Sequence, residues 1–137
     1  MPFPKKQKNK IIAIIPARAG SKRVLKKNFR DFCGKPMIAW TIEKLKQCTS
    51  IDEVIISTDS SEIKSITETY GATVPFLRPN ELSDDFTTTS AVIKHSLEWY
   101  LENHEMPSLV LTIYPTAVLV PLEKIIEAIE IIHSAKS

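Results

Sequence analysis

The stretch Ile11-Ile12-Ala13-Ile14-Ile15-Pro16 decides the fold class of this 137-residue chain. Its five apolar residues, four of them β-branched, run without interruption to a proline, as is typical of a strand buried on both faces of a parallel sheet. Two more runs of strand length, residues 53–57 and 109–114, have the same character. A fourth run, residues 73–77, contains Pro75, which favours an edge strand or an irregular extended segment.

Four segments with apolar residues at intervals of three and four lie between and after these runs, which predicts four amphipathic helices. The first follows Pro36, the second begins at the cap-and-acid spacing of Asp59 and Glu62, the third covers about residues 88–103, and the last starts at Pro121. The residues expected to face the sheet are Met37, Ile38, Thr41, Ile42 and Leu45; Ile63, Ile66 and Tyr70; Val92, Ile93, Leu97, Tyr100 and Leu101; and Leu122, Ile125, Ile126, Ile129 and Ile132.

The alternating order of strands and helices predicts an α/β fold. We expect a Rossmann-like, doubly wound, mainly parallel sheet with helices on both faces. We expect residues 1–10 to form a disordered basic leader and residues 11–137 to form one α/β domain. A crossover helix normally leads to another parallel strand, so we expect this domain to be truncated at the C-terminus.

The composition excludes several classes of protein. With 43% hydrophobic and 25% charged residues, the chain is typical of a globular protein rather than a disordered one. No apolar run is long enough to cross a membrane and no signal sequence precedes the domain, so we expect a cytoplasmic protein without membrane contact. Cys33 and Cys48 lie apart from each other and from any histidine cluster, which argues against a disulfide framework or a zinc site.

Charge is separated along the chain. The first 30 residues contain ten lysines and arginines and no acid, whereas the remainder contains eight basic and 16 acidic residues. The lysines of the leader are typical of a solvated terminus. The basic residues after the first strand are candidates for ligand binding, because ligands of parallel α/β sheets bind at the carboxyl ends of the strands.

The segment that leaves the first strand, residues 16–23 with the sequence Pro-Ala-Arg-Ala-Gly-Ser-Lys-Arg, suits an anionic ligand. Backbone N–H groups near Gly20 and Ser21 can surround phosphate oxygens, and Arg18, Lys22 and Lys27 supply compensating charge. The motifs GxxxxGK[ST] and GxGxxG are absent, which disfavours a P-loop or a dinucleotide site. Phosphate or nucleotide binding, nucleic-acid backbone binding and a merely solvated loop remain open; without stacking aromatics or a recognition helix, nucleic acid is disfavoured.

These residues also carry a resemblance. The stretch 14–23, Lys27-Asn28 and the stretch 34–37 (Gly-Lys-Pro-Met) are similar to the amino-terminal signature of the CMP-sialic acid synthetases, the acylneuraminate cytidylyltransferase family. Further matches follow in order: residues 54–59 (Val-Ile-Ile-Ser-Thr-Asp), 70–72 (Tyr-Gly-Ala), 76–79 (Phe-Leu-Arg-Pro), 81–85 (Glu-Leu-Ser-Asp-Asp) and Thr87. The stretch 78–85, and Ile113-Tyr114 followed by Thr116, most resemble the pseudaminic acid cytidylyltransferase branch.

The resemblance implies a fold of the nucleotide-diphospho-sugar transferase type, in which residues 11–137 form a nucleotide-binding α/β domain, and it also implies an activity, a site and partners. The activity is transfer of CMP from CTP to the anomeric hydroxyl of a nine-carbon sialic-type acid, with Mg²⁺ assistance, release of pyrophosphate and no nucleophilic side chain. Arg18 and Lys27 would have the catalytic role of steadying the triphosphate, and Arg78 and Thr89 would lie near the cytidine. The full-length form would be a homodimer, and the Mg²⁺ ligands would lie outside this chain. The nucleotide-binding residues would be Ala17, Arg18, Gly20, Ser21, Lys22, Lys27, Asn28, Arg78 and Thr89.

Some interpretations stay open. The family's segment after the fourth strand reaches the sugar acid, but here it reads Tyr-Pro-Thr-Ala-Val at residues 114–118 and lacks the second proline, so the acceptor is undecided. A non-catalytic CTP-binding fragment and a sugar-1-phosphate nucleotidyltransferase are the alternatives. Asp84-Asp85 fits a helix cap better than a metal pair, and Asp59 is either a cap or part of the nucleotide pocket.

Overall fold

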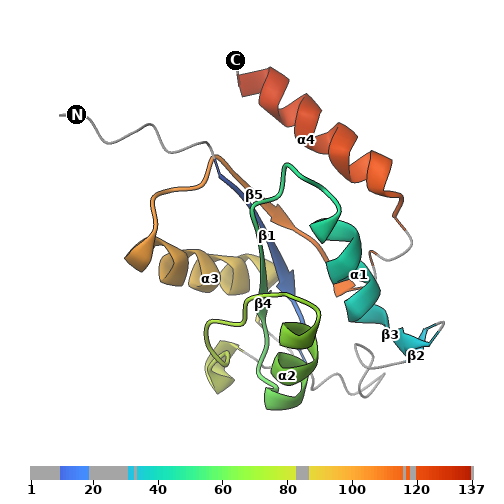
Figure 1. The fold of residues 1–137 in the computed structure, drawn as a ribbon. Helices are drawn as coiled ribbons and strands as arrows, with labels where there is room; N and C mark the ends of the chain where they lie inside the picture. The colour runs from blue at the N-terminus through green and yellow to red at the C-terminus, as the bar shows by residue number, and fades with distance from the viewer. Residues whose placement is uncertain are drawn as a thin grey trace, which may run out of the picture.

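A three-stranded parallel sheet lies at the centre of the protein (Figure 1). Strand β1 (Ile11–Pro16) pairs with β4 (Glu53–Ser57) on one side and with β5 (Leu109–Thr112) on the other, so that Ile14 lies opposite Ile55 and Thr112. The structure is a computed structural model, and it describes residues 10–18, 31–32, 34–82, 87–115, 117 and 120–136.

Residues 73–77 extend this sheet irregularly beyond β4. Two isolated parallel bridges, Ile55 to Thr73 and Thr58 to Leu77, replace a continuous ladder. Pro75 lies between them and has no N–H to donate, which explains why the run does not form a regular strand. β1, β4 and this segment run parallel, so their carboxyl ends lie at the same edge of the sheet. Arg78, which directly follows Leu77 of the second bridge, therefore lies at this edge.

Helices cover both faces of the sheet, which confirms the predicted fold class (Figure 1). On one face lie α1 (Met37–Lys46), α2 (Ser61–Thr69) and α4 (Leu122–Lys136), and on the other lies α3 (Thr89–Asn103). The alternation of β1 produces this arrangement, because successive side chains of a strand point to opposite faces. Ile11, Ala13 and Ile15 pack against α1, α2 and α4, whereas Ile12 and Ile14 pack with Tyr100 of α3.

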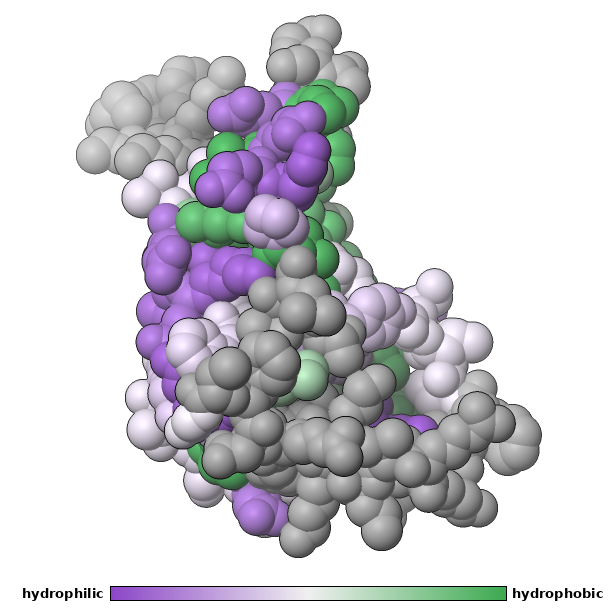
Figure 2. Space-filling model, turned by 90° about the vertical axis from the view of Figure 1, so that its right-hand side faces the viewer, coloured by the Kyte–Doolittle hydropathy of each residue, from purple (hydrophilic) through white to green (hydrophobic). Residues whose placement is uncertain are grey.

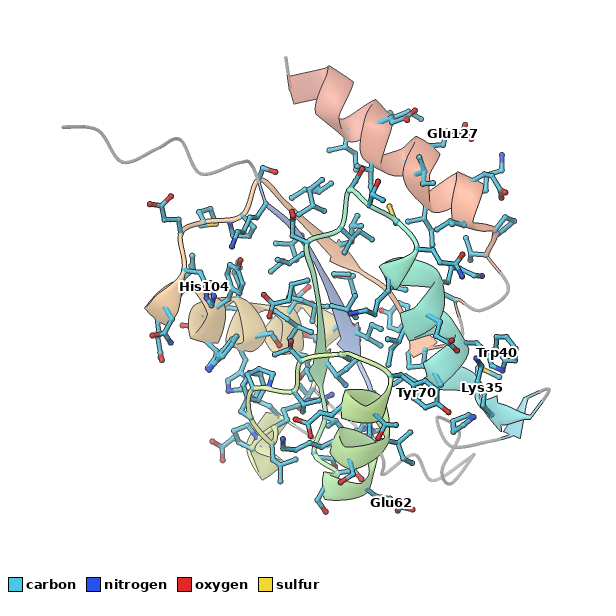
Figure 3. All side chains as sticks on the ribbon, viewed as in Figure 1. Lys35, Trp40, Glu62, Tyr70, His104 and Glu127 are labelled. Atoms are coloured by element: carbon cyan, nitrogen blue, oxygen red, sulfur yellow. The ribbon has the colours of Figure 1, made fainter. Side chains whose placement is uncertain are left out.

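Two short strands before α1 were not predicted. Strands β2 (Asp31–Phe32) and β3 (Lys35–Pro36) form an antiparallel hairpin, in which Gly34 adopts a φ of 95° that favours glycine. Two-residue strands are too short to produce a hydrophobic period. Lys35 of this hairpin lies 3.9 Å from the ring centroid of Trp40 and 5.8 Å from that of Tyr70 (Figure 3).

Three details of the helices differ from the predictions. Ser60, not Asp59, caps α2, since its Oγ accepts from the N–H of Ile63 at 3.1 Å. Leu101 and Ile132 are 38% and 37% exposed rather than inward. Figure 2 shows hydrophobic residues (green) next to hydrophilic residues (purple) on the surface at the top of the view.

Tyr100 of α3 leads to a prediction about pH. Its ring is fully buried and stacks on His104, and its hydroxyl has no hydrogen-bond partner among the residues that the structure describes. Burial, with the Glu53 and Asp52 carboxylates, raises the pKa of Tyr100 above its ordinary value of 10.0. The unfolded chain therefore loses this proton at lower pH than the folded chain, so stability present below about pH 10 declines as the pH rises.

We expect Tyr100→Phe to leave the free energy of unfolding at pH 7 unchanged or to raise it by up to about 1 kcal/mol, because the buried hydroxyl is unsatisfied. Urea unfolding at pH 7 and at about pH 10.5 measures how much the free energy of unfolding falls between these two pH values. The wild type should lose more stability than the variant. An equal loss in both proteins would show that Tyr100 does not contribute to the alkaline decline.

Candidate functional site

A pocket of about 230 Å³ opens at the carboxyl edge of the sheet. Its walls come from the ends of β1 and β5, from the residues after the 73–77 segment, and from the start of α3. Parallel α/β sheets place ligands at this edge, because the loops that follow neighbouring strands converge there. The lining residues are Pro16, Arg18, Arg78, Thr87, Thr89, Val92 and Tyr114.

Arg78 forms the floor of the pocket and joins three parts of the chain. Its Nε donates to Ser57 Oγ at 3.1 Å, its Nη2 to the Ser57 carbonyl at 2.7 Å and its Nη1 to the Leu82 carbonyl at 3.1 Å. The Ser57 carbonyl also accepts from the N–H of Ala17 at 2.9 Å. The same guanidinium group therefore ties the end of β4 to the turn Asn80–Leu82, next to the exit of β1.

The electrostatics of the pocket favour an anion. Burial lowers the pKa of Arg78, the Asp59 carboxylate partly offsets this effect, and the positive charge of Arg18 lowers it further. Arginine stays protonated in spite of such a shift. Two guanidinium groups repel each other at this pocket, so the pocket favours a bound group with several negative oxygens.

Hydroxyl groups line the rim of the pocket. Thr89 Oγ1 and the Tyr114 hydroxyl are 3.0 Å apart and share a hydrogen bond, which links the start of α3 to the end of β5. Thr87 Oγ1 donates to the Glu81 carbonyl at 3.2 Å. These groups can donate or accept at the edge of a base or a sugar, so the pocket has a cationic floor and a neutral polar rim.

The structure brings three of the predicted site residues together, namely Arg18, Arg78 and Thr89. Ala17 is buried in the core and its N–H is occupied by Ser57, so its side chain does not line the pocket. Asp59, the alternative pocket residue, acts on Arg78 from nearby. The predicted residues Gly20, Ser21, Lys22, Lys27 and Asn28, and the pair Asp84-Asp85, lie outside the described residues.

Sequence reasoning did not include Thr87, Val92 and Tyr114 among the site residues. Tyr114 follows a parallel strand directly, so the rule that identified Arg18 after β1 would also have identified Tyr114 after β5. Val92 carried no separate signal, because its position in α3 is equally explained by core packing, and it is in fact buried.

The part of the chain that the structure describes contains no cluster of metal-ligating side chains. No group of three or more His, Cys, Asp or Glu side chains occurs within it. Mg²⁺ is usually held by one or two carboxylates together with water and substrate phosphates, so it does not require such a cluster. No helix in the described portion is long and apolar enough to cross a membrane.

The sheet order and the placement of the pocket define a doubly wound α/β protein with a ligand site at its carboxyl edge. The solved structure of CMP-2-keto-3-deoxy-manno-octonic acid synthetase complexed with CTP has the same fold, with a TM-score of 0.75 and 20% identity over 93% of this chain and 49% of that one. The model of the family described as Cytidylyltransferase matches residues 12–137. The chain belongs to this family.

Two relatives show how close the similarity is. Pseudaminic acid cytidylyltransferase of Campylobacter jejuni is 39% identical over 121 residues, which cover 88% of this chain and 52% of the relative. CMP-N,N'-diacetyllegionaminic acid synthase of Legionella pneumophila is 41% identical over 125 residues, which cover 89% of this chain and 53% of the relative. The chain therefore spans about half the length of these relatives.

Proposed function

We propose that this protein binds CTP in the pocket at the carboxyl edge of its sheet and transfers CMP to a nonulosonic acid, with release of pyrophosphate. The observation that carries the proposal is the convergence of Arg18, Arg78 and Thr89 on one pocket in a chain of the cytidylyltransferase family. These residues come from three separate segments of the sequence, and only the parallel sheet places them together.

The described residues have distinct tasks in this proposal. Arg18 neutralises phosphate charge, which is the main requirement of nucleotidyl transfer, because such reactions depend on positioning and on stabilising charge at the phosphate oxygens. Arg78 holds the floor rigid and keeps its own positive charge next to the ligand. Thr89 and Tyr114 offer hydroxyls to the nucleoside. Lys22 and Lys27, with Gly20, Ser21 and Asn28, would complete the phosphate site. Mg²⁺, when bound with the nucleotide, would supply further neutralisation of charge at the phosphate oxygens.

The acceptor that we propose is a nine-carbon sialic-type acid of the pseudaminic or legionaminic kind. The relatives named for these two sugars differ little in identity to this chain, 39% and 41%, so identity does not choose between them. The missing second proline after Tyr114 falls in the segment that the family resemblance assigns to the acceptor. A homodimer of the full-length form remains a prediction.

Acceptor-dependent release of pyrophosphate tests the proposed transfer. The protein is incubated with CTP and Mg²⁺, alone, with a nonulosonic acid, or with a sugar 1-phosphate. We expect release only with the nonulosonic acid, because the nucleophile is its anomeric hydroxyl. Release with the sugar phosphate instead would favour a sugar-1-phosphate nucleotidyltransferase. CTP binding without release under any condition would favour a non-catalytic CTP-binding fragment.

A further inference from the structure

The backbone that follows β5 is attached to α1 by a buried hydrogen bond. Thr41 lies in the middle of α1, and its Oγ1 donates to the carbonyl of Pro115 at 2.6 Å. Both residues are buried, so water cannot replace the donor if the hydroxyl is removed. A buried carbonyl without a donor is costly, and the backbone that carries it moves toward water where it can.

Lys44 repeats this contact one turn further along α1. Its Nζ donates to the Ala117 carbonyl at 3.2 Å and also to the Val120 carbonyl. Residues i and i+3 of a helix lie on the same side, so Thr41 and Lys44 present their donors to the same stretch of backbone. Three carbonyl groups of the segment after β5 therefore point toward α1.

The opposite side of this segment faces the pocket. Tyr114, the residue directly before Pro115, lines the pocket and shares a hydrogen bond with Thr89 of α3. Two turns stiffen the backbone between the contacts, since the N–H of Ala117 donates to the Tyr114 carbonyl and the N–H of Val120 to the Ala117 carbonyl, each at 2.9 Å. A shift at Pro115 is thus passed directly to Tyr114.

We propose that Thr41 is a positioning residue of the nucleotide pocket: it holds the Pro115 carbonyl and thereby places the Tyr114 side chain as the pocket wall, with Lys44 securing the next turn. Thr41 itself lies outside the pocket lining. This role of Thr41 rests on the proposed function only in that CTP is taken as the ligand of the pocket. The position of the segment itself can be measured without any ligand.

The ligand-free test is amide hydrogen exchange by NMR on Thr41→Val, which keeps the shape of the side chain and removes its hydroxyl. We expect exchange at the Ala117 and Val120 amides to accelerate by about tenfold relative to the amide of Ile56, which bonds to Thr73 in the sheet. Thr41→Ser, which retains the hydroxyl, should restore slow exchange.

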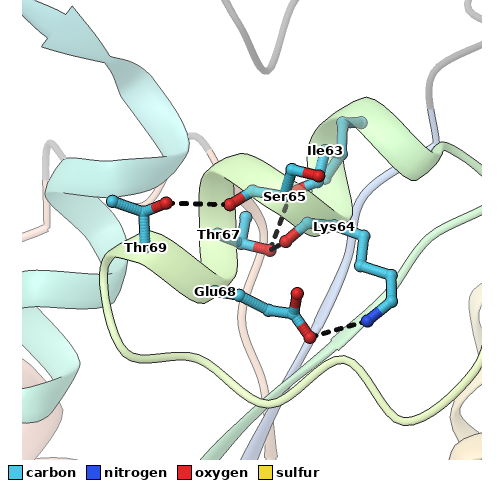
Figure 4. Close-up of polar contacts among 6 residues, drawn as sticks. All are labelled: Ile63, Lys64, Ser65, Thr67, Glu68 and Thr69. Carbon is cyan, nitrogen blue, oxygen red and sulfur yellow. Dashed lines mark hydrogen bonds and ion pairs between the residues drawn. The ribbon is translucent and has the colours of Figure 1, made fainter.

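The matched control is Thr67→Val in α2. Thr67 is also a buried helical threonine, but its hydroxyl donates to the Ile63 and Lys64 carbonyls of its own helix, at 2.8 and 3.2 Å (Figure 4). This variant loses a buried hydrogen bond of the same kind without touching the segment after β5. Equal exchange profiles in the Thr41 and Thr67 variants would overturn the proposal, whether or not the protein binds CTP.

A double-mutant cycle tests whether Thr41 acts through Tyr114. Thr41→Val should weaken CTP binding by about three- to tenfold in the wild-type background and have no effect when Tyr114→Ala is already present. Equal effects in both backgrounds would contradict the proposed route. A wild-type protein that binds no CTP would refute the proposed function, and the exchange experiment would then decide the role of Thr41 separately.

Discussion

Arg78→Met is expected to lower the free energy of unfolding by about 2–4 kcal/mol and to abolish measurable nucleotide binding. Methionine fills the space of the side-chain stem but removes the three hydrogen bonds that the guanidinium group donates to Ser57 and to the Leu82 carbonyl, although the Ser57 carbonyl still accepts from the N–H of Ala17. The end of β4 and the turn Asn80–Leu82 would no longer be joined, so the floor of the pocket would be lost. Urea unfolding and calorimetric titration with CTP measure the two effects.

Arg78→Lys separates charge from geometry. Lysine keeps a positive charge at this position but cannot match the planar fork of arginine, which reaches all three acceptors at once. We therefore expect stability between that of the wild type and that of Arg78→Met, with CTP affinity still strongly reduced. A methionine variant within about 0.5 kcal/mol of the wild type would show that these hydrogen bonds do not organise the site.

Arg18→Ala and Lys27→Ala should each weaken CTP binding by about 10- to 100-fold, because a charged hydrogen bond to phosphate contributes roughly 1.5–3 kcal/mol. Arg18 lines the pocket, and Lys27 belongs to the basic segment that follows it in the sequence. Arg18→Ala should leave the urea midpoint nearly unchanged, since Arg18 does not belong to the hydrophobic core of the described residues. Calorimetric titration with CTP measures the affinities.

Lys64→Ala is the control for these two variants. Lys64 forms an exposed ion pair with Glu68 on α2 and does not line the pocket (Figure 4). Its removal also takes away one positive charge, so it corrects for the change in net charge. Unchanged CTP affinity in both Arg18→Ala and Lys27→Ala would refute the assignment of the basic segment to the triphosphate.

The sequence predicted the fold where its signals were long and periodic. The apolar run of β1 and the four amphipathic patterns led to the parallel sheet and to helices on both faces, as the structure has them. The hairpin of β2 and β3 was not predicted, because its two strands of two residues each are too short to show a hydrophobic period. The cap of α2 was assigned to Asp59 rather than Ser60, because adjacent polar residues satisfy the same cap pattern and only the backbone geometry separates them.

The site was predictable to the extent that it follows strand ends. Arg18 was found from its position after β1, and Arg78 and Thr89 from the family resemblance. The hydrogen bond of Arg78 to Ser57 joins residues 21 positions apart, and Thr41 bonds to a carbonyl 74 residues away. Such contacts depend on how the helices dock on the sheet, so no local pattern in the sequence contains them.

The central claim is that the pocket at the carboxyl edge selects CTP. Calorimetric titration of the purified 137-residue protein with CTP, UTP and GTP in the presence of Mg²⁺ tests this claim most directly. We expect saturable binding of CTP and at least tenfold weaker binding of UTP and GTP, which corresponds to a difference of about 1.4 kcal/mol in binding free energy. Equal affinity for all three nucleotides, or no binding of CTP, would contradict it.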